Sequence, residues 1–206
     1  IKKLKLDNEK LKLEIIIKDE NVMPGHKVIV KPTQKIGNNV YNCEVVRVLG
    51  HVNDPGVDIL SIVCKHEFPD TFSEEVMAEV EQIPGHVSEE EIEKRLARGG
   101  VDLRDRMIFT IDGDDTKDID DAIEVKKLEN GNYYLGVHIA DVSYYVKPGS
   151  RLYESAYTRG TSVYLADRVV PMLPHKLSNG ICSLNPNEDR LAISCMMEIS
   201  KQGKII

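Results

Sequence analysis

Residues 112–121 concentrate carboxylates, because six of these ten positions are aspartates. An apolar run at residues 107–111 precedes them and is predicted to be a strand running into the core. Like charges a few ångströms apart repel each other unless protons or cations offset them. Carboxylate oxygens are ligands that Mg²⁺ and Mn²⁺ prefer. The spacing predicts a magnesium cluster for phosphoryl chemistry. Its members are Asp112, Asp118, Asp120 and Asp121.

Two simpler interpretations compete with this one. An aspartate-rich turn can be an acidic surface loop with no ligand. A calcium loop of the EF-hand type needs Gly at its sixth position and Glu at its twelfth. Starting at Asp112 places Lys117 and Ile123 there, and starting at Asp114 places Ile119 and Val125 there. The EF-hand pattern therefore fails, and the lack of His or Cys in the run disfavours zinc.

The first 66 residues predict a small antiparallel β-barrel of the oligonucleotide-binding kind, with another small barrel or sandwich left open. Strands are expected at 11–17, 26–32, 41–50 and 57–65. Tyr41 is the sole Phe, Trp or Tyr among these residues, so the sequence offers few rings on which bases could stack. Contact with RNA would therefore rely on Lys and Arg at phosphates.

Residues 67–100 change to a helical period and predict a two-helix connector. Ser73 and Ser88 are the expected N-caps, and Pro84-Gly85 and Gly99-Gly100 are the expected stops. The acidic residues of these helices are expected to form a solvated face.

Residues 101–206 predict part of a mixed α/β domain, which makes the whole chain α+β. A hairpin is expected over 122–146 with its turn at 129–132, a short helix over 150–160, and a strand within 189–206. The three expected domains are therefore 1–66, 67–100 and 101–206.

Charge is unevenly distributed within the net −7 of the 206 residues. Residues 67–131 carry 8 Lys and Arg against 20 Asp and Glu, whereas residues 1–66 carry 11 against 8. An acidic total does not exclude a nucleic-acid partner if metal neutralises the cluster. No apolar run approaches the roughly 20 residues of a membrane helix. The four cysteines, expected to be buried thiols in a reducing cytoplasm, are Cys43, Cys64, Cys182 and Cys195.

The aspartate spacing resembles the four-aspartate signature of the ribonuclease II/R family of 3′-to-5′ exoribonucleases. Residues 136–192, with "RGTSVY" and "LSNGICSLNP", resemble the catalytic domain of that family. Residues 48–62, "VLGHVNDPGVDILSI", resemble the second cold-shock barrel of its ribonuclease R branch. The resemblance covers most of residues 20–203, and all four aspartates are present.

The resemblance implies a role for each residue. Asp112 and Asp121 would hold Mg²⁺, with Mn²⁺ as the alternative ion. Asp118 would help to shape the cluster, and Asp120 would orient the reacting water or a second ion. Tyr164 would stack on the 3′-terminal base of a single-stranded RNA. His138 is expected to serve in packing.

The resemblance also implies a cytoplasmic enzyme that releases nucleoside 5′-monophosphates. The family uses a later arginine and glutamate and a further RNA-binding barrel, so the chain is expected to be an inactive fragment. Two alternatives remain open. One is an RNA-binding module with a structural acidic loop, and the other is a metal-dependent phosphodiesterase acting on DNA or small molecules. Protein partners and oligomeric state do not follow from the sequence.

Overall fold

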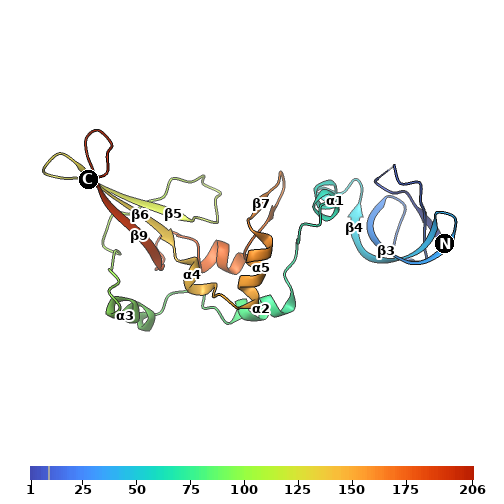
Figure 1. Cartoon of the computed structure of the whole chain (residues 1–206), viewed down its shortest axis with the longest axis horizontal. Coiled ribbons are helices and arrows are strands. Elements are labelled where there is room, and N and C mark those ends of the chain that lie inside the picture. Colours follow the sequence, from blue (N-terminus) through green and yellow to red (C-terminus); the bar gives the residue numbers. More distant parts are fainter. Residues whose placement is uncertain (9) are drawn as a thin grey trace. The chain divides into compact units, whose positions relative to one another are not determined.

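The computed structural model describes residues 1–8 and 10–206, whose contacts divide them into two compact units (Figure 1). The first unit contains Ile1–Asp70 and Tyr164–Val169, and the second contains Thr71–Val163 and Val170–Ile206. The mixed architecture with a small β-rich unit confirms the predicted fold class. The division into three domains stays a prediction.

The first unit is built on a sheet in the order β1-β2-β4-β3. Its strands are β1 (Lys2–Leu4), β2 (Glu14–Ile17), β3 (His26–Gly37) and β4 (Val40–His51). A hairpin turn joins β3 to β4, with Asn39 in the left-handed region at φ 63°. One pairing differs from the antiparallel expectation, because β2 runs parallel to β4. Ile15, Ile17, Val22 and Cys43 form the buried core of this sheet.

The strand expected at residues 57–65 is wrong, because Val57–Lys65 forms helix α1. Gly56 adopts a left-handed conformation at φ 79° and turns the chain into the helix. Val57 and Val63 are buried on it, and Asp58 and Lys65 lie at the ends that suit their charges. A short run rich in Ile and Val fits either element by pattern alone.

Five helical segments belong to the second unit, and serine caps begin three of them. The segments are α2 (Glu74–Glu81), α3 (Glu89–Ala97), α4 (Val142–Tyr145), α5 (Arg151–Arg159) and the π-helical η1 (Leu177–Ile181). The side chains of Ser73, Ser88 and Ser150 each accept a hydrogen bond from the backbone N–H three residues later. These caps confirm the two helices predicted within 67–100 and the helix predicted over 150–160.

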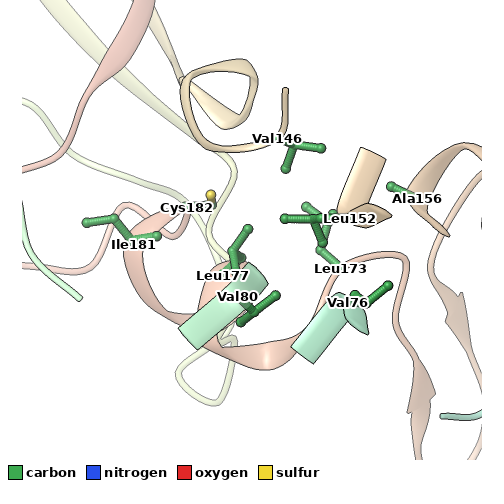
Figure 2. Packing of buried hydrophobic residues seen from close by; sticks show 9 residues of the cluster. All are labelled: Val76, Val80, Val146, Leu152, Ala156, Leu173, Leu177, Ile181 and Cys182. Carbon is green, nitrogen blue, oxygen red and sulfur yellow. The ribbon is translucent and has the colours of Figure 1, made fainter. Parts of the chain in front are cut away.

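A hydrophobic cluster joins α2, α5 and η1, as Figure 2 shows. Val80 and Leu177 are fully buried in it, and Leu152 is nearly so. Glu79 on α2 reinforces the packing, because its carboxylate accepts hydrogen bonds from the backbone N–H groups of Arg151 and Leu152 at 2.9 and 2.8 Å. These bonds lower the pKa of Glu79. Helix α2 thus belongs to the core of this unit.

The remainder of the second unit is a three-stranded antiparallel sheet in the order β5-β6-β9. Its strands are β5 (Asp121–Lys127), β6 (Tyr133–Ala140) and β9 (Ala192–Ile199). The predicted hairpin and the predicted strand within 189–206 are both confirmed. Two further short strands, β7 (Val163–Tyr164) and β8 (Val169–Val170), pair with each other.

The strand expected at 107–111 is wrong. Only Phe109 forms a bridge there, with Ile123, through hydrogen bonds of 3.0 and 2.9 Å. A tight turn from Arg106 to Ile108 precedes the bridge, and no further pairing follows it before β5. The side chains of Met107 and Ile111 are therefore exposed and do not enter the core.

The cysteines and the lengths of the helices can also be compared with the expectations from the sequence. All four cysteines are free thiols, and Cys43 and Cys182 are buried. Cys195 is exposed on β9 and Cys64 is half-buried, which corrects the expectation that all four are buried. Within the described residues, no helix is long and apolar enough to cross a bilayer.

An ion pair connects α3 to the end of β6. Arg95 on α3 contacts the carboxylate of Asp141, which is buried and also accepts hydrogen bonds from the hydroxyl of Ser143 and the N–H of Tyr144. Burial alone would raise the pKa of Asp141, but these bonds and the Arg95 charge lower it below its ordinary 3.8. Asp141 therefore stabilises the fold above that pH, and the contribution is lost as the pH falls through the lowered pKa.

We expect Arg95→Ala to destabilise the protein by about 1–3 kcal/mol, because it leaves a buried carboxylate with one partner fewer. The pKa of Asp141 should rise, so acid unfolding should begin at a higher pH. Lys94→Ala is the matched control, since Lys94 pairs with the exposed Glu90 on the same helix. Thermal unfolding measured from pH 3 to pH 7 tests both, and equal losses from the two variants would contradict this account.

Candidate active site

The aspartate run lies in an irregular loop that leads into β5. The N–H of Thr116 bonds the carbonyl of Gly113 at 3.0 Å, which forms a turn through Asp114 and Asp115. Asp121 is the first residue of β5 and pairs with Ile139 of β6. The loop therefore changes the backbone direction between Asp112 and Asp121, which a straight strand could not do.

Backbone hydrogen bonds fix the second half of this loop to distant parts of the sequence. The N–H of Ala140 bonds the carbonyl of Asp120 at 3.0 Å, and the N–H of Leu184 bonds the carbonyl of Ile119 at 2.8 Å. The buried Ser183 hydroxyl lies 3.0 Å from the N–H of Ile119. The peptide groups around Asp118 and Asp120 are thus held at the end of the sheet.

Three of the four candidate aspartates act electrostatically on the fourth, Asp120. The pKa of Asp120 is raised, first by partial desolvation and then by the charges of Asp118, Asp121 and Asp112. Asp120 stays exposed by surface area, so this desolvation comes from the nearby chain and is incomplete. The three charges are those of the residues chosen from the sequence spacing. Asp114 and Asp115, from the same loop, are not among the causes.

The chemistry of these four side chains suits a hard divalent cation. Four carboxylates supply oxygen ligands, and a cation would relieve the repulsion that penalises ionised Asp120. In the part of the chain that the structure describes, no three His, Cys, Asp or Glu side chains form a group tight enough to hold an ion. Convergence of all four carboxylates on one ion therefore stays a prediction.

The other candidate residues have different surroundings. Tyr164 ends strand β7, its side chain is 64% exposed, and its contacts place it in the first unit, whereas all four aspartates belong to the second. His138 is buried on β6, with its Nδ1 2.8 Å from the hydroxyl of Ser194. Its Nε2 has no hydrogen-bond partner within the described residues. Burial lowers the pKa of His138, which suits a neutral packed side chain.

The segment after η1 contributes to the site but was not expected to do so from the sequence. Burial raises the pKa of the Cys182 thiol to about 12, and the charge of Asp120 is among the further causes. Ser183 and Leu184 bond the aspartate loop directly. The only sequence signal for this segment was its place in the motif "LSNGICSLNP", because a contact between residues more than 60 positions apart leaves no local pattern.

Comparison with known proteins places these observations in a family. Residues 101–206 match the RNB domain, and residues 4–73 match the cold shock domain. The chain belongs to the RNB domain family. The RNB match covers the whole aspartate loop, the β5-β6-β9 sheet and the segment after η1.

Individual RNB relatives agree with this assignment. The chain is 46% identical over 209 residues to ribonuclease R 1 of Lactococcus lactis, with 98% of this chain and 25% of that protein aligned. It is 48% identical over 207 residues to ribonuclease R of Thermotoga maritima, with 97% and 28% aligned. A solved structure of Mycoplasma genitalium RNase R with double-stranded RNA matches with a TM-score of 0.82 at 30% identity, over 95% of this chain and 34% of that one. The chain thus spans about a quarter to a third of the length of these relatives.

We expect Asp120→Asn to stabilise the metal-free protein slightly, raising Tm by about 1–3 °C. A raised carboxyl pKa means that ionised Asp120 opposes folding at neutral pH, and the opposition disappears as the pH falls below that pKa. The gain should therefore be present at pH 7 and absent near pH 3. Asp114→Asn, from the same loop, should leave Tm unchanged. Thermal unfolding in EDTA is the measurement, and a destabilised Asp120→Asn would show that the loop is not under this strain.

Proposed function

We propose that the complete protein containing this chain is a magnesium-dependent 3′-to-5′ exoribonuclease, with Mn²⁺ as the alternative cation. It would hydrolyse the phosphodiesters of single-stranded RNA to nucleoside 5′-monophosphates. One observation carries the proposal: in a chain of the RNB family, the charges of Asp112, Asp118 and Asp121 all act on Asp120. Asp118 and Asp121 are close to Asp120 in the chain and would act on it in any loop, so the effect of the more distant Asp112 is the informative one.

Each aspartate would have its own task. Asp112 and Asp121 would hold the cation, and Asp118 would shape the cluster around it. A carboxylate oxygen of Asp120 would accept a hydrogen bond from the attacking water and orient it toward the phosphorus. When bound, the cation would supply activation of that water and stabilisation of the leaving oxygen. Asp120 suits the water-orienting role because partial desolvation and the neighbouring charges raise its pKa, which favours proton exchange with a water.

RNA is the partner that the remaining features support. The M. genitalium RNase R structures contain double-stranded RNA and ribose-methylated single-stranded RNA, and those proteins share this fold at a TM-score of 0.82. The cold shock unit carries the basic excess of residues 1–66, suited to phosphates. Tyr164 is 64% exposed, which supports a role in stacking on a 3′-terminal base. The cytoplasm, where RNA and reduced thiols occur together, is the proposed location.

Two other functions make different predictions. A pure RNA-binding module would bind RNA without any effect of Mn²⁺ and would release no nucleotides. A phosphodiesterase of different substrate class would degrade matched DNA as fast as RNA, since the 2′-hydroxyl distinguishes the two. Incubating the complete protein with labelled RNA and DNA strands of one sequence, with and without Mg²⁺, separates all three. The inactivity expected of the isolated 206-residue chain stays a prediction that the same assay tests.

We expect Asp120→Asn to reduce RNA cleavage at least about 100-fold while changing RNA affinity less than about twofold. The amide keeps the shape of the side chain but removes a charge needed as the transition state forms. Asp114→Asn is the matched control and should cleave at the wild-type rate. Single-turnover cleavage and RNA binding in EDTA are the two measurements. Parallel loss of binding and cleavage would show that Asp120 is a structural residue.

We expect Tyr164→Ala to change the length of the smallest RNA left undegraded, because a stacked base contributes about 1–3 kcal/mol to holding a short 3′ end. Tyr157→Ala is the control, since Tyr157 is also an exposed tyrosine but lies on α5 beside Tyr153. Gel analysis of a time course on a labelled 20-nucleotide RNA gives the readout. An unchanged end product with Tyr164→Ala would remove the stacking role.

A further inference from the structure

Ser183 lies beside the aspartate loop with its hydroxyl between two peptide groups. Its Oγ accepts a hydrogen bond from the N–H of Ile119 at 3.0 Å and donates one to the carbonyl of Lys117 at 2.9 Å. These peptide groups flank Asp118 on either side. One hydroxyl has a single proton and two lone pairs, so it can form both bonds at once. The carboxamide oxygen of Asn185, at 3.1 Å, is a competing acceptor for that proton.

The surroundings hold Ser183 firmly in place. The residue is fully buried. Its N–H bonds the carbonyl of Gly180 at 2.9 Å, and its own carbonyl accepts a bond from Nε of Arg190 at 2.8 Å. The side chain of Arg190 is itself only 6% exposed and pairs with Glu188. The neighbouring Leu184 bonds the carbonyl of Ile119.

The loop needs such an anchor because six like charges lie within residues 112–121, and like charges this close disfavour a compact loop. Residues 112–120 form no regular helix or strand that would resist this effect. Nothing in the mechanism proposed above requires Ser183 to touch RNA or water. Its hydroxyl is engaged by the backbone of Lys117 and Ile119 and by the carboxamide of Asn185.

We propose that Ser183 is a positioning residue that holds the backbone on both sides of Asp118, so that only the side chains of the aspartate loop have to move when a divalent cation binds. This inference rests on the proposed function, since the cation belongs to it. Partners that orient metal ligands from outside the coordination shell typically contribute 10–100-fold to metal affinity or activity. The effect of losing these hydrogen bonds should therefore appear first in the cation requirement.

The test compares Ser183→Ala with Ser178→Ala in the complete protein. Ser178 is in the same segment, but its hydroxyl bonds Asn179 and not the aspartate loop. Mn²⁺ binding is followed without RNA by the free-ion paramagnetic resonance signal, below the unfolding temperature of each variant. RNA binding is measured in EDTA, and cleavage is measured against Mn²⁺ concentration.

We expect Ser183→Ala to raise the half-saturating Mn²⁺ concentration about tenfold in both binding and cleavage, with RNA affinity in EDTA unchanged. Ser178→Ala should match the wild type. A folded Ser183→Ala with wild-type Mn²⁺ binding would overturn the inference even if its Tm falls, because a merely structural serine would affect only Tm. If the alanine variant does not fold, Ser183→Cys carries the same test, since a thiol leaves no cavity, is slightly larger than the hydroxyl and forms only weak hydrogen bonds.

The wild-type protein keeps the two proposals distinguishable. A wild type that binds no Mn²⁺ and cleaves no RNA refutes the proposed function, and with it this inference. If the wild type binds Mn²⁺ and cleaves RNA, and Ser183→Ala has the same Mn²⁺ requirement, the inference about Ser183 is refuted and the proposed function is not.

Discussion

The second unit depends on a balance at the aspartate loop. Repulsion between carboxylates favours opening of the loop, and hydrogen bonds to its backbone keep it closed. The charges of Asp112, Asp118 and Asp121 act on Asp120. A loop without other contacts would reduce this repulsion by opening. Bonds from Ala140, Ser183 and Leu184 to the loop backbone oppose the opening. Ligand-binding sites often contain a destabilised segment that the surrounding structure holds in place.

The rest of the second unit holds the backbone of the aspartate loop from two sides. Ala140 belongs to the central strand of the β5-β6-β9 sheet, so the sheet fixes one side of the loop. Ser183 and Leu184 follow η1, whose Leu177 and Ile181 are buried in the cluster with α2 and α5, so that cluster fixes the other side. The hydrophobic core thus does more than stabilise the unit, because it determines where the aspartate backbone lies.

The spacing of Asp112, Asp118, Asp120 and Asp121 is local information, and three of these charges do raise the pKa of the fourth, Asp120. Their role in binding a cation stays a prediction, whereas parts of the predicted local structure were wrong. The strand expected at 107–111 failed because pairing depends on a partner strand, and only Phe109 found one. Residues 57–65 formed a helix because Gly56 and the end charges favour it, which a short apolar run does not reveal. Ser183 could not be found, since its partners lie 64 and 66 positions away.

The most direct test of the central claim is to locate the cation. A crystal structure of the complete protein with Mn²⁺, using anomalous scattering, shows which atoms coordinate it. We predict one or two ions bound by carboxylate oxygens of Asp112, Asp118, Asp120 and Asp121. If two ions are bound, they should lie about 3.5–4 Å from each other. Ions bound elsewhere, or these four carboxylates directed to different sides of an ordered loop, would contradict it.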